Sequence, residues 1–256
     1  MNVRICILVK NEIDNLKRSL PILNELGVEI FIFDSGSSDG SMEFSEEFDN
    51  VCVIERGYKS HYETYNFITN SFFDSLSGFV LILDADMTLS DDLKKFISSG
   101  DFNKDVYSSK VKMCVDGRLV RYGSLYPHKP FMFRLGDAYF VESGHGERVG
   151  DQFPVSLAPG WIVHDDRKGY SEFIASQVRY GKSLHQRFTY GSVTGRDKFR
   201  VKYPFLIFLI PLYSYLLKGG LFSGRSGINY ALDRLIAEAI MHRISSSAEC
   251  VNNDAA

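Results

Sequence analysis

The chain has 256 residues, of which 45% are apolar and 24% are charged, and these proportions are those of an ordinary globular protein. Its net charge of -3 argues against a general nucleic-acid binder but leaves room for a local basic patch. The four cysteines show neither a CxxC pair nor metal-ligand spacing, and no signal peptide is recognisable at the N-terminus. Reduced thiols and a cytoplasmic location are therefore expected.

Apolar runs alternate with helical patterns along the first part of the chain. Pro21 lies inside the first predicted helix, and Ser90 is placed to cap the last one. Strands that are apolar on both faces and alternate with helices indicate a parallel sheet covered on both sides. Strands are predicted at 3–10, 28–34 and 78–84, and helices at 12–26, 62–76 and 90–97.

The pattern changes after residue 105 to shorter strands and loops, as in "VYSSKVKMCV", "RLVRYGSL" and "KPFMFRL". These segments predict a mixed, partly antiparallel half of the same sheet. The expected fold class is α/β, with a mixed, mostly parallel central sheet and helices on both faces. A first domain is expected over 1–168, a helical region over 169–245 and a disordered tail over 246–256.

Two of the predicted strands run out into carboxylates. One ends in Asp34 and is followed by small residues, beginning with Ser35, that let backbone N–H groups approach a ligand. The other ends in Asp84 and Asp86, which could hold Mg²⁺ or Mn²⁺ together with substrate phosphates. Either segment alone could be a simple turn. Because both follow buried strands, we expect a binding site at the carboxyl edge of the sheet.

The motifs "ILVKNE", "DSGSSDGS" and "LDADM" resemble the nucleotide-binding half of glycosyltransferase family 2, the inverting sugar transferases of the Rossmann-like GT-A fold. The resemblance implies that Asp34 holds the nucleobase of a nucleotide sugar, that Asp86 ligates the metal on its diphosphate, and that Asp84 lies near the donor ribose or sugar. It also implies a donor half over 1–100 and an acceptor half over 101–168. UDP is the nucleotide that the resemblance favours.

A leaving nucleoside diphosphate gains negative charge, which a cation and positive side chains stabilise. The family usually has an Arg-Asn pair before a helix between the two acidic motifs, and Tyr65-Asn66 occupies that place here. Asn66 is expected to keep its role in donor binding. Lys59 or Arg56 is expected to replace the missing arginine near the diphosphate, and the alternative is that they lie on an exposed charged loop.

The acceptor half must supply a carboxylate that takes the proton of the attacking hydroxyl. "YFVESGHGERVGD" resembles a His-Glu motif in a bacterial subgroup of the family, similar to lipopolysaccharide-core β-glucosyltransferases. In that subgroup the His and Glu are adjacent, whereas a glycine separates His145 from Glu147 here. Glu147 is the expected base, and Glu142 and Asp165 are its rivals.

The run "GWIVHDD" places His164 where the same subgroup has a histidine between a strand and a helix. A neutral imidazole at this point would complete the metal shell or bind phosphate. A lone histidine is also often structural, so both interpretations stay open.

The run "YPFLIFLIPLYSYLL" is too short for a membrane-spanning helix, and Pro211 interrupts it. No acidic residue occurs from Lys198 to Leu232, and basic residues flank the apolar run. This pattern is typical of a segment lying in an anionic membrane interface, expected here on the inner face of the cytoplasmic membrane. The alternatives are packing on the first domain or on a second copy in a homodimer. The tail also resembles the bacterial subgroup, whose acceptor is often a lipid-anchored glycan.

Two other functions compete with this interpretation. A metal-dependent nucleotidyltransferase also uses strand-end aspartates, but "VKNEIDN" is not the Gly-rich basic loop that usually follows its first strand. An inactive glycan-binding relative would not need Asp34, Asp84 and Asp86 intact. The sequence therefore predicts an inverting, metal-dependent hexosyltransferase that acts on a glycan or lipid-linked acceptor in cell-surface polysaccharide or lipopolysaccharide synthesis.

Overall fold

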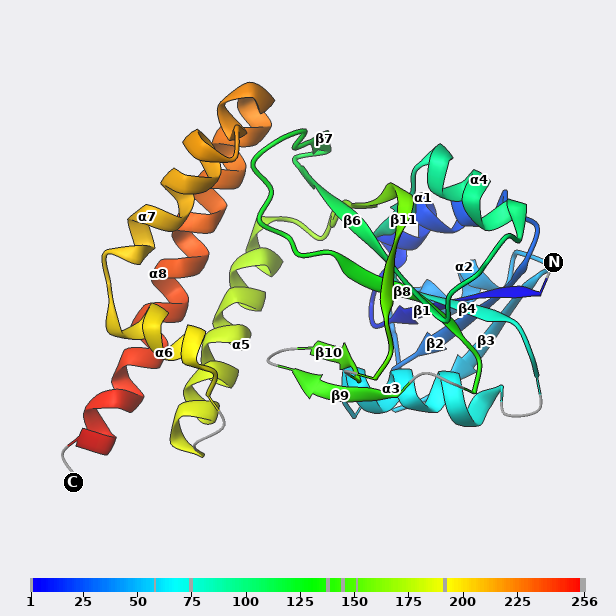
Figure 1. Ribbon diagram of the computed structural model, residues 1–256, viewed down its shortest axis with the longest axis horizontal. Helices are drawn as coiled ribbons and strands as arrows, with labels where there is room; N and C mark the ends of the chain where they lie inside the picture. The colour runs from blue at the N-terminus through cyan, green and yellow to red at the C-terminus, as the bar shows by residue number, and fades with distance from the viewer. Residues whose placement is uncertain are drawn as a thin grey trace. The chain divides into compact units, whose positions relative to one another are not determined.

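The structure is a computed structural model that describes residues 2–57, 59–73, 76–136, 139–143, 146–150, 152–190 and 193–253, with side chains outside 142–148 and 247–256. The chain forms two compact units (Figure 1). The first comprises residues 1–113 and 126–167, and the second comprises residues 114–125 and 168–256.

The first unit is built on one mixed sheet, whose strands β3, β2, β1 and β4 lie side by side in that order and run parallel. Parallel order brings the carboxyl ends of β2 and β4 to the same edge, on either side of β1. The two acidic segments therefore meet at one edge, as the sequence predicts. The bounds are Val3–Val9 for β1, Glu29–Asp34 for β2, Val51–Glu55 for β3 and Phe79–Asp84 for β4.

The sheet continues beyond β4 with β8, β6, β11 and β5. β8 is antiparallel to both β4 and β6, β11 is parallel to β6, and β5 is antiparallel to β11. Antiparallel pairs thus take a larger share than in the mostly parallel sheet that was predicted, because β8 lies between β4 and β6 and runs opposite to both. The bounds are Met87–Leu89 for β5, Val106–Val115 for β6, Lys129–Arg134 for β8 and Val155–His164 for β11.

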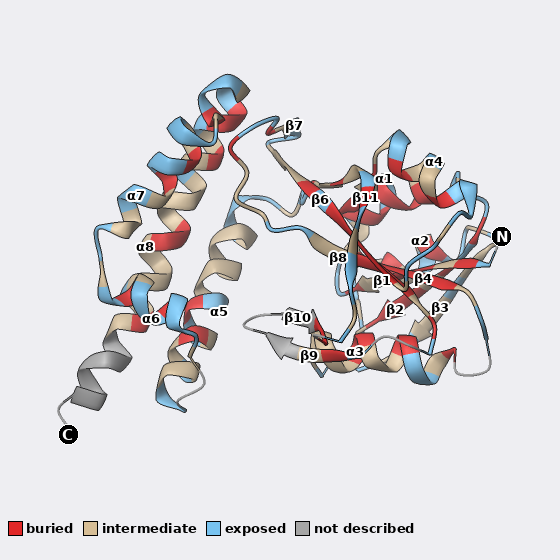
Figure 2. Ribbon diagram, in the orientation of Figure 1, coloured by how far each residue is buried: buried red, intermediate tan, exposed pale blue. Residues whose placement is uncertain are grey.

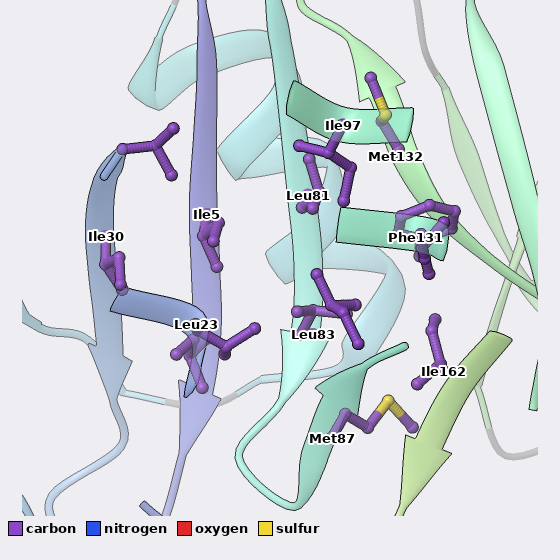
Figure 3. Close-up of a cluster of buried hydrophobic side chains, with 14 of the residues drawn as sticks. Ile5, Leu23, Ile30, Leu81, Leu83, Met87, Ile97, Phe131, Met132 and Ile162 are labelled. Atoms are coloured by element: carbon purple, nitrogen blue, oxygen red, sulfur yellow. The ribbon is translucent and has the colours of Figure 1, made fainter. Parts of the chain in front are cut away.

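Helices cover both faces of the sheet, as predicted. α1 (Ile13–Asn24) and α4 (Asp91–Ser99) bury their apolar side chains against one face. Alternate strand residues, among them Ile5, Ile30 and Leu81, point into this core (Figure 3). Figure 2 shows that the buried positions concentrate along the strands of this unit.

The other face carries α3 (His61–Phe67), the π-helical turn η1 (Ile68–Phe72) and a hairpin of β9 (Phe140–Ser143) with β10 (Gly146–Val149). Aromatic rings from these elements pack edge to face over the sheet. The single helix predicted over 62–76 is therefore α-helical only in its first part.

Pro21 lies inside α1, and Ser90 directly precedes α4. α1 continues through Pro21, since its inner face of buried leucines holds it against the sheet despite the missing N–H. At α4, the Ser90 hydroxyl accepts a hydrogen bond from the N–H of Leu93 (3.4 Å), which confirms Ser90 as the N-cap.

The second unit is helical. α5 and α7 pack along the long α8, and the buried carboxylate of Glu238 in α8 receives hydrogen bonds from Arg200 and Arg234. Among the described residues, no helix is both long enough and apolar enough to cross a membrane. The bounds are Tyr170–Thr189 for α5, Gly195–Lys202 for α6, Leu206–Leu212 for α7, Tyr213–Leu217 for the π-helical turn η2, Gly220–Ser223 for the 3-10 turn η3 and Arg225–Asn253 for α8.

Residues 114–125 belong to this second unit, although the sequence assigned them to the first domain. The Ser214 hydroxyl donates to the carbonyl oxygen of Gly123 (2.6 Å), and the N–H of Leu125 donates to the Tyr230 hydroxyl (2.9 Å). The segment starts with a short hairpin in which the end of β6 pairs with β7 (Arg118–Leu119). α8 also continues to Asn253, past the residue at which a disordered tail was predicted to begin.

Gly78 is required at the turn into β4. Its φ is +116°, and a Cβ added to it would lie 2.2 Å from the backbone oxygen of Asn2. We expect Gly78→Ala to lower the free energy of unfolding by about 2–4 kcal/mol, because backbone strain and a steric clash act together. Urea denaturation followed by circular dichroism measures this. Gly57→Ala is the control, since no described atom would lie within 4 Å of its new Cβ; equal stability of the two variants would contradict the packing of Gly78.

Candidate active site

The loops that follow β1 and β2 are bound to each other at the carboxyl edge of the sheet. The N–H of Asn11 donates to the Ser37 hydroxyl (2.8 Å), and the Asn11 side-chain oxygen accepts from the N–H of Ser38 (2.9 Å). Lys10 Nζ donates to the carbonyl oxygen of Ser35 (3.0 Å). Asn11 holds a φ of 53°, which asparagine adopts more readily than most residues. The motifs "VKNE" and "DSGSSDG" thus form one continuous structure.

Asp39, for which no role was predicted, caps α1 from the neighbouring loop. Its Oδ2 accepts from the N–H of Ile13 (3.0 Å), and its Oδ1 accepts from the hydroxyl of Ser41 (2.6 Å), the first residue of α2 (Ser41–Ser45). Partial burial acts to raise the pKa of Asp39, but the bonds from Ser41 and Ile13 outweigh it and lower the pKa. The ionised form is therefore favoured, which suits a carboxylate at a helix N-terminus.

Asp34 is fully buried and holds the loop after β2 in shape. One carboxylate oxygen accepts from the N–H groups of Gly36 and Ser37, both at 2.8 Å, and the other accepts from the Ser37 hydroxyl. A buried carboxylate needs such compensation. Contact with a nucleobase stays a prediction for Asp34, and the structure adds this second role.

A small pocket opens between the ends of β1 and β2 and the start of α3. The Arg56 guanidinium lies 3.5 Å from the ring centroid of Phe67. The backbone N–H of Arg56 donates to the carbonyl oxygen of Asp34 (2.7 Å). An apolar floor with a hydroxyl and a guanidinium at its side suits a planar heterocycle. The pocket is lined by Leu8, Phe33, Ser35, Arg56, Gly57 and Thr64.

The two other predicted donor contacts have different environments. The Asn66 amide donates to the carbonyl oxygen of Phe140 (2.8 Å) and accepts from its N–H (2.9 Å), so that it clamps the β9–β10 hairpin to α3. This geometry gives Asn66 a structural task, and donor binding stays a prediction. Lys59 lies exposed on the loop before α3, and no ion pair of its ammonium occurs among the described residues.

Asp84, at the end of β4, forms an ion pair with Lys129, whose Nζ donates to Oδ2 at 2.8 Å. Lys129 begins β8, and the antiparallel pairing of β4 with β8 brings the end of one strand beside the start of the other. Burial acts to raise the pKa of Asp84, but the Lys129 ammonium, with smaller effects from His61 and His164, lowers it. Asp84 is therefore ionised and partly neutralised by its neighbour.

Asp86 and His164 come together because β5 pairs with the end of β11, where Met87 lies opposite His164. His164 Nε2 lies 3.3 Å from Asp86 Oδ2. Burial raises the pKa of Asp86; His164 counteracts this, and the carboxylates of Asp84 and Asp166 add to it. Among the described residues, neither Asp86 Oδ1 nor His164 Nδ1 has a hydrogen-bond partner, although both atoms are buried.

The unpaired Asp86 oxygen fits a ligand position for a divalent cation, with the imidazole of His164 beside the same carboxylate. A buried carboxylate oxygen without a donor is costly unless a ligand completes its shell, and an imidazole nitrogen is a common second ligand. The described part of the chain has no group of three or more His, Cys, Asp or Glu placed to hold an ion. Asp86 and His164 would thus leave the remaining positions to substrate phosphates and water, as is usual for Mg²⁺.

The predicted base, Glu147, lies in the β9–β10 hairpin. His145 lies outside the described residues, and Glu147 and Glu142 are described in their backbone alone, opposite each other in the β9–β10 register. Asp165 is described: both its oxygens accept from Arg167, at 2.8 and 2.7 Å, and Arg18 lies 3.6 Å away. Asp165 is therefore engaged in ion pairs, which weakens it as a rival to Glu147.

Sequence reasoning missed two basic residues of this site. Lys129 is the first residue of an apolar strand, and its proximity to Asp84 depends on a strand order that local patterns do not reveal. Arg18 lies on the predicted helix α1 and donates to the carbonyl oxygen of Asp86 at 3.4 Å. A charged residue at the start of a buried strand was the available signal for Lys129.

The comparisons with known proteins agree with this architecture. Residues 4–146 match the family described as Glycosyl transferase family 2, which is more than half of the chain. The chain belongs to this family, and it is a glycosyltransferase. A search of curated proteins gave no match.

Solved structures resemble the chain at low identity. The mannosyltransferase PcManGT from Pyrobaculum calidifontis, in complex with GDP-Man and Mn2+, is 14% identical with a TM-score of 0.50, covering 94% of this chain and 87% of that one. TarS 1–349 of S. aureus, in complex with UDP-GlcNAc, is 14% identical with a TM-score of 0.47, covering 98% and 92%. At this identity the mannosyltransferase supports the fold alone, which is GT-A-like.

The bonds of Asp34 predict an effect without any ligand. We expect Asp34→Ala to lower the free energy of unfolding by about 2–4 kcal/mol, because the donors of the loop lose a buried carboxylate acceptor. Urea denaturation in nucleotide-free buffer measures this. Asp49→Ala is the control, since Asp49 is exposed and its loss should change stability by less than about 0.5 kcal/mol. If Asp34→Ala were as stable as the wild type, the role of Asp34 would be limited to contact with a ligand.

Proposed function

We propose that this protein is an inverting, divalent-metal-dependent hexosyltransferase that moves a sugar from a nucleotide sugar to a hydroxyl group. The observation that carries the proposal is the meeting of two polar pairs at one sheet edge. Lys129 lies 2.8 Å from Asp84, and His164 lies 3.3 Å from Asp86, one of whose oxygens is buried and has no partner in the described part of the chain. The first pair holds the Lys129 ammonium in place, and the second offers ligands for a cation.

The donor would extend along this edge. The nucleobase would occupy the pocket beside Ser35 and Arg56, and the diphosphate would lie toward Asp86 and His164. A bound Mg²⁺ or Mn²⁺ would neutralise the diphosphate. Lys129 would stabilise the charge that grows on the leaving group, and Lys59 is a second candidate for this role. UDP is proposed as the nucleotide from the family resemblance.

The acceptor hydroxyl would attack the anomeric carbon from the face opposite the leaving diphosphate, which inverts its configuration. The carbon–oxygen bond to the diphosphate breaks as the new glycosidic bond forms, and a carboxylate takes the proton of the hydroxyl. Glu147 is proposed as this base. Its support is the position of "GHGERVGD" in the acceptor half and the engagement of Asp165 with Arg167.

The acceptor is proposed to be a glycan or a lipid-linked glycan in cell-surface polysaccharide or lipopolysaccharide synthesis. The support is the resemblance of the tail and of "YFVESGHGERVGD" to the bacterial lipopolysaccharide-core subgroup. A peripheral location on the inner face of the cytoplasmic membrane follows from the same proposal. It draws on the apolar run between Lys198 and Leu232, which lacks acidic residues.

Asp86→Ala should abolish metal-dependent binding of the donor while the fold is retained. A screen of nucleotide sugars by thermal shift, with and without Mn²⁺, identifies the donor, which raises the melting temperature by mass action. Asp101→Ala, an exposed carboxylate on a loop, is the control and should bind the donor normally. Equal donor affinity of Asp86→Ala and wild type in Mn²⁺ would show that Asp86 does not hold the metal.

The released product separates the reaction classes. A nucleoside diphosphate identifies a sugar transferase, whereas inorganic pyrophosphate would identify a nucleotidyltransferase. A protein that binds nucleotide sugars with Mn²⁺ but turns none of them over with any acceptor, or with water, would fit an inactive relative.

Glu147→Gln should keep the donor affinity and lose most transfer, because a base contributes about 10²–10⁴-fold to the chemical step and little to donor binding. Initial rates of nucleoside diphosphate release with the acceptor measure this loss. Glu142→Gln, opposite in the hairpin register, is the matched control and should stay active. Near-normal turnover of Glu147→Gln together with loss in Glu142→Gln would move the base to Glu142.

A further inference from the structure

The helical stretch formed by α7 and η2 is apolar on both of its faces. Its inner face packs on α8, where Pro211 and Ser214 are buried and Leu206 and Ile207 line a small pocket with residues of α5 and α8. A helix that is apolar all round lies in a core or in a membrane environment. Its outer face therefore needs an explanation.

The outer face is an exposed apolar stripe. Its members recur at helical spacing along α7 and η2, and large side chains continue it through η3. Leu217 is 79% exposed, Phe222 is 76% exposed and Phe208 is 66% exposed. Figure 2 shows exposed positions recurring along α7, while α8 is largely buried or intermediate. The stripe consists of Phe205, Phe208, Leu209, Leu212, Tyr213, Leu216, Leu217, Leu221 and Phe222.

The end of the stripe is held by close backbone packing within the second unit. A Cβ added to Gly123 would lie 2.6 Å from Gly220 Cα, and one added to Gly227 would lie 1.9 Å from the Gly220 oxygen. The Ser214 hydroxyl donates to the Gly123 carbonyl oxygen at 2.6 Å. The end of the stripe is thus carried on a closely packed backbone.

Exposed basic residues stand at both ends of the stripe. Lys198 and Lys202 precede α7, and Lys218 and Arg225 flank η3. Lys202 Nζ lies 5.7 Å from the ring centroid of Tyr203, and Lys218 Nζ lies 5.8 Å from that of Tyr213. From residue 198 to 232 the sequence has no carboxylate. An apolar strip between cations matches the acyl region and the anionic headgroups of a phospholipid monolayer.

A second copy of the chain is a poorer occupant. If two copies paired through their stripes with their α7 helices antiparallel, Lys202 of one copy would lie near Lys218 of the other. If the α7 helices were parallel, each lysine would lie near the same lysine of the other copy. Either arrangement opposes cations without a carboxylate between them.

We propose that the stripe is the surface by which this protein inserts into one leaflet of an anionic phospholipid bilayer, with α7 and η2 lying in the plane of the interface. The inference deepens the proposed function, since it names the surface on which a lipid-linked acceptor would be met. The basic ends provide attraction that salt screens, and the apolar stripe provides attraction that salt does not remove.

Co-sedimentation of the full chain with vesicles of phosphatidylcholine and phosphatidylglycerol tests the proposal. Wild type should sediment with these vesicles at low salt and retain a bound fraction at high salt. Phe208→Asp with Leu216→Asp should lower the partition coefficient at least about tenfold, because two apolar side chains no longer enter the monolayer. Lys202→Gln with Lys218→Gln should remove mainly the salt-sensitive part of binding.

The matched control is Leu157→Asp with Tyr190→Asp, which adds the same charges at exposed apolar positions outside the stripe and should bind vesicles like wild type. Circular dichroism and the donor thermal shift establish that each variant is folded. Wild type that binds the donor but stays in the supernatant at low salt would overturn this inference and leave the proposed function intact. The stripe would instead be a contact with a second copy if the wild type did not bind vesicles and formed a dimer that the stripe variant dissociated.

Discussion

Three carboxylates at the ends of β2 and β4, one fully buried and two half-buried, impose the constraint on which this edge of the sheet depends. Each must be compensated, because an ionised group loses its hydration when it is buried. Asp34 is satisfied by the N–H groups and the hydroxyl of its own loop, and Asp84 is neutralised by Lys129. Asp86 is satisfied in part, since His164 reaches one oxygen and the other has no partner among the described residues. This gradation separates their tasks: Asp34 maintains the loop, Asp84 fixes a positive side chain, and Asp86 retains binding capacity for a ligand.

The same gradation explains what the sequence could and could not reveal. Both acidic segments were recognised because each follows a buried strand, and this is a local pattern. The compensation of the second segment is non-local: Lys129 reaches Asp84 because β8 inserts antiparallel beside β4, and His164 reaches Asp86 because β5 pairs with the far end of β11. Residue spacing carries no information about strand order. The resemblance to the family pointed to His164, whereas Lys129 had no motif to mark it. Asn66 is the opposite case. It matches a position of the family motif, but its amide is hydrogen-bonded to the backbone of Phe140.

The helical region shows a similar division between local and non-local information. The sequence identified the apolar run and its basic flanks, but hydropathy does not distinguish the face of α7 that packs on α8 from the face that stays exposed. The inclusion of residues 114–125 in the second unit was equally hidden, because it depends on contacts of Gly123 and Leu125 with helices far along the chain. Small residues at Gly123, Gly220 and Gly227 were the available sign of a close approach.

An exposed stripe of large apolar side chains favours aggregation in water, so a chain that retains one needs a compensating benefit. A lipid-linked acceptor would provide that benefit. A soluble enzyme meets such an acceptor by diffusion from bulk solvent, whereas an enzyme held at the same leaflet searches in two dimensions, and the effective concentration of acceptor rises without any new contact in the active site. Weak and reversible insertion is sufficient for this gain. In this proposal the described polar residues of the site serve the donor, and recognition of the acceptor is shared between the loop that carries Glu147 and the membrane surface.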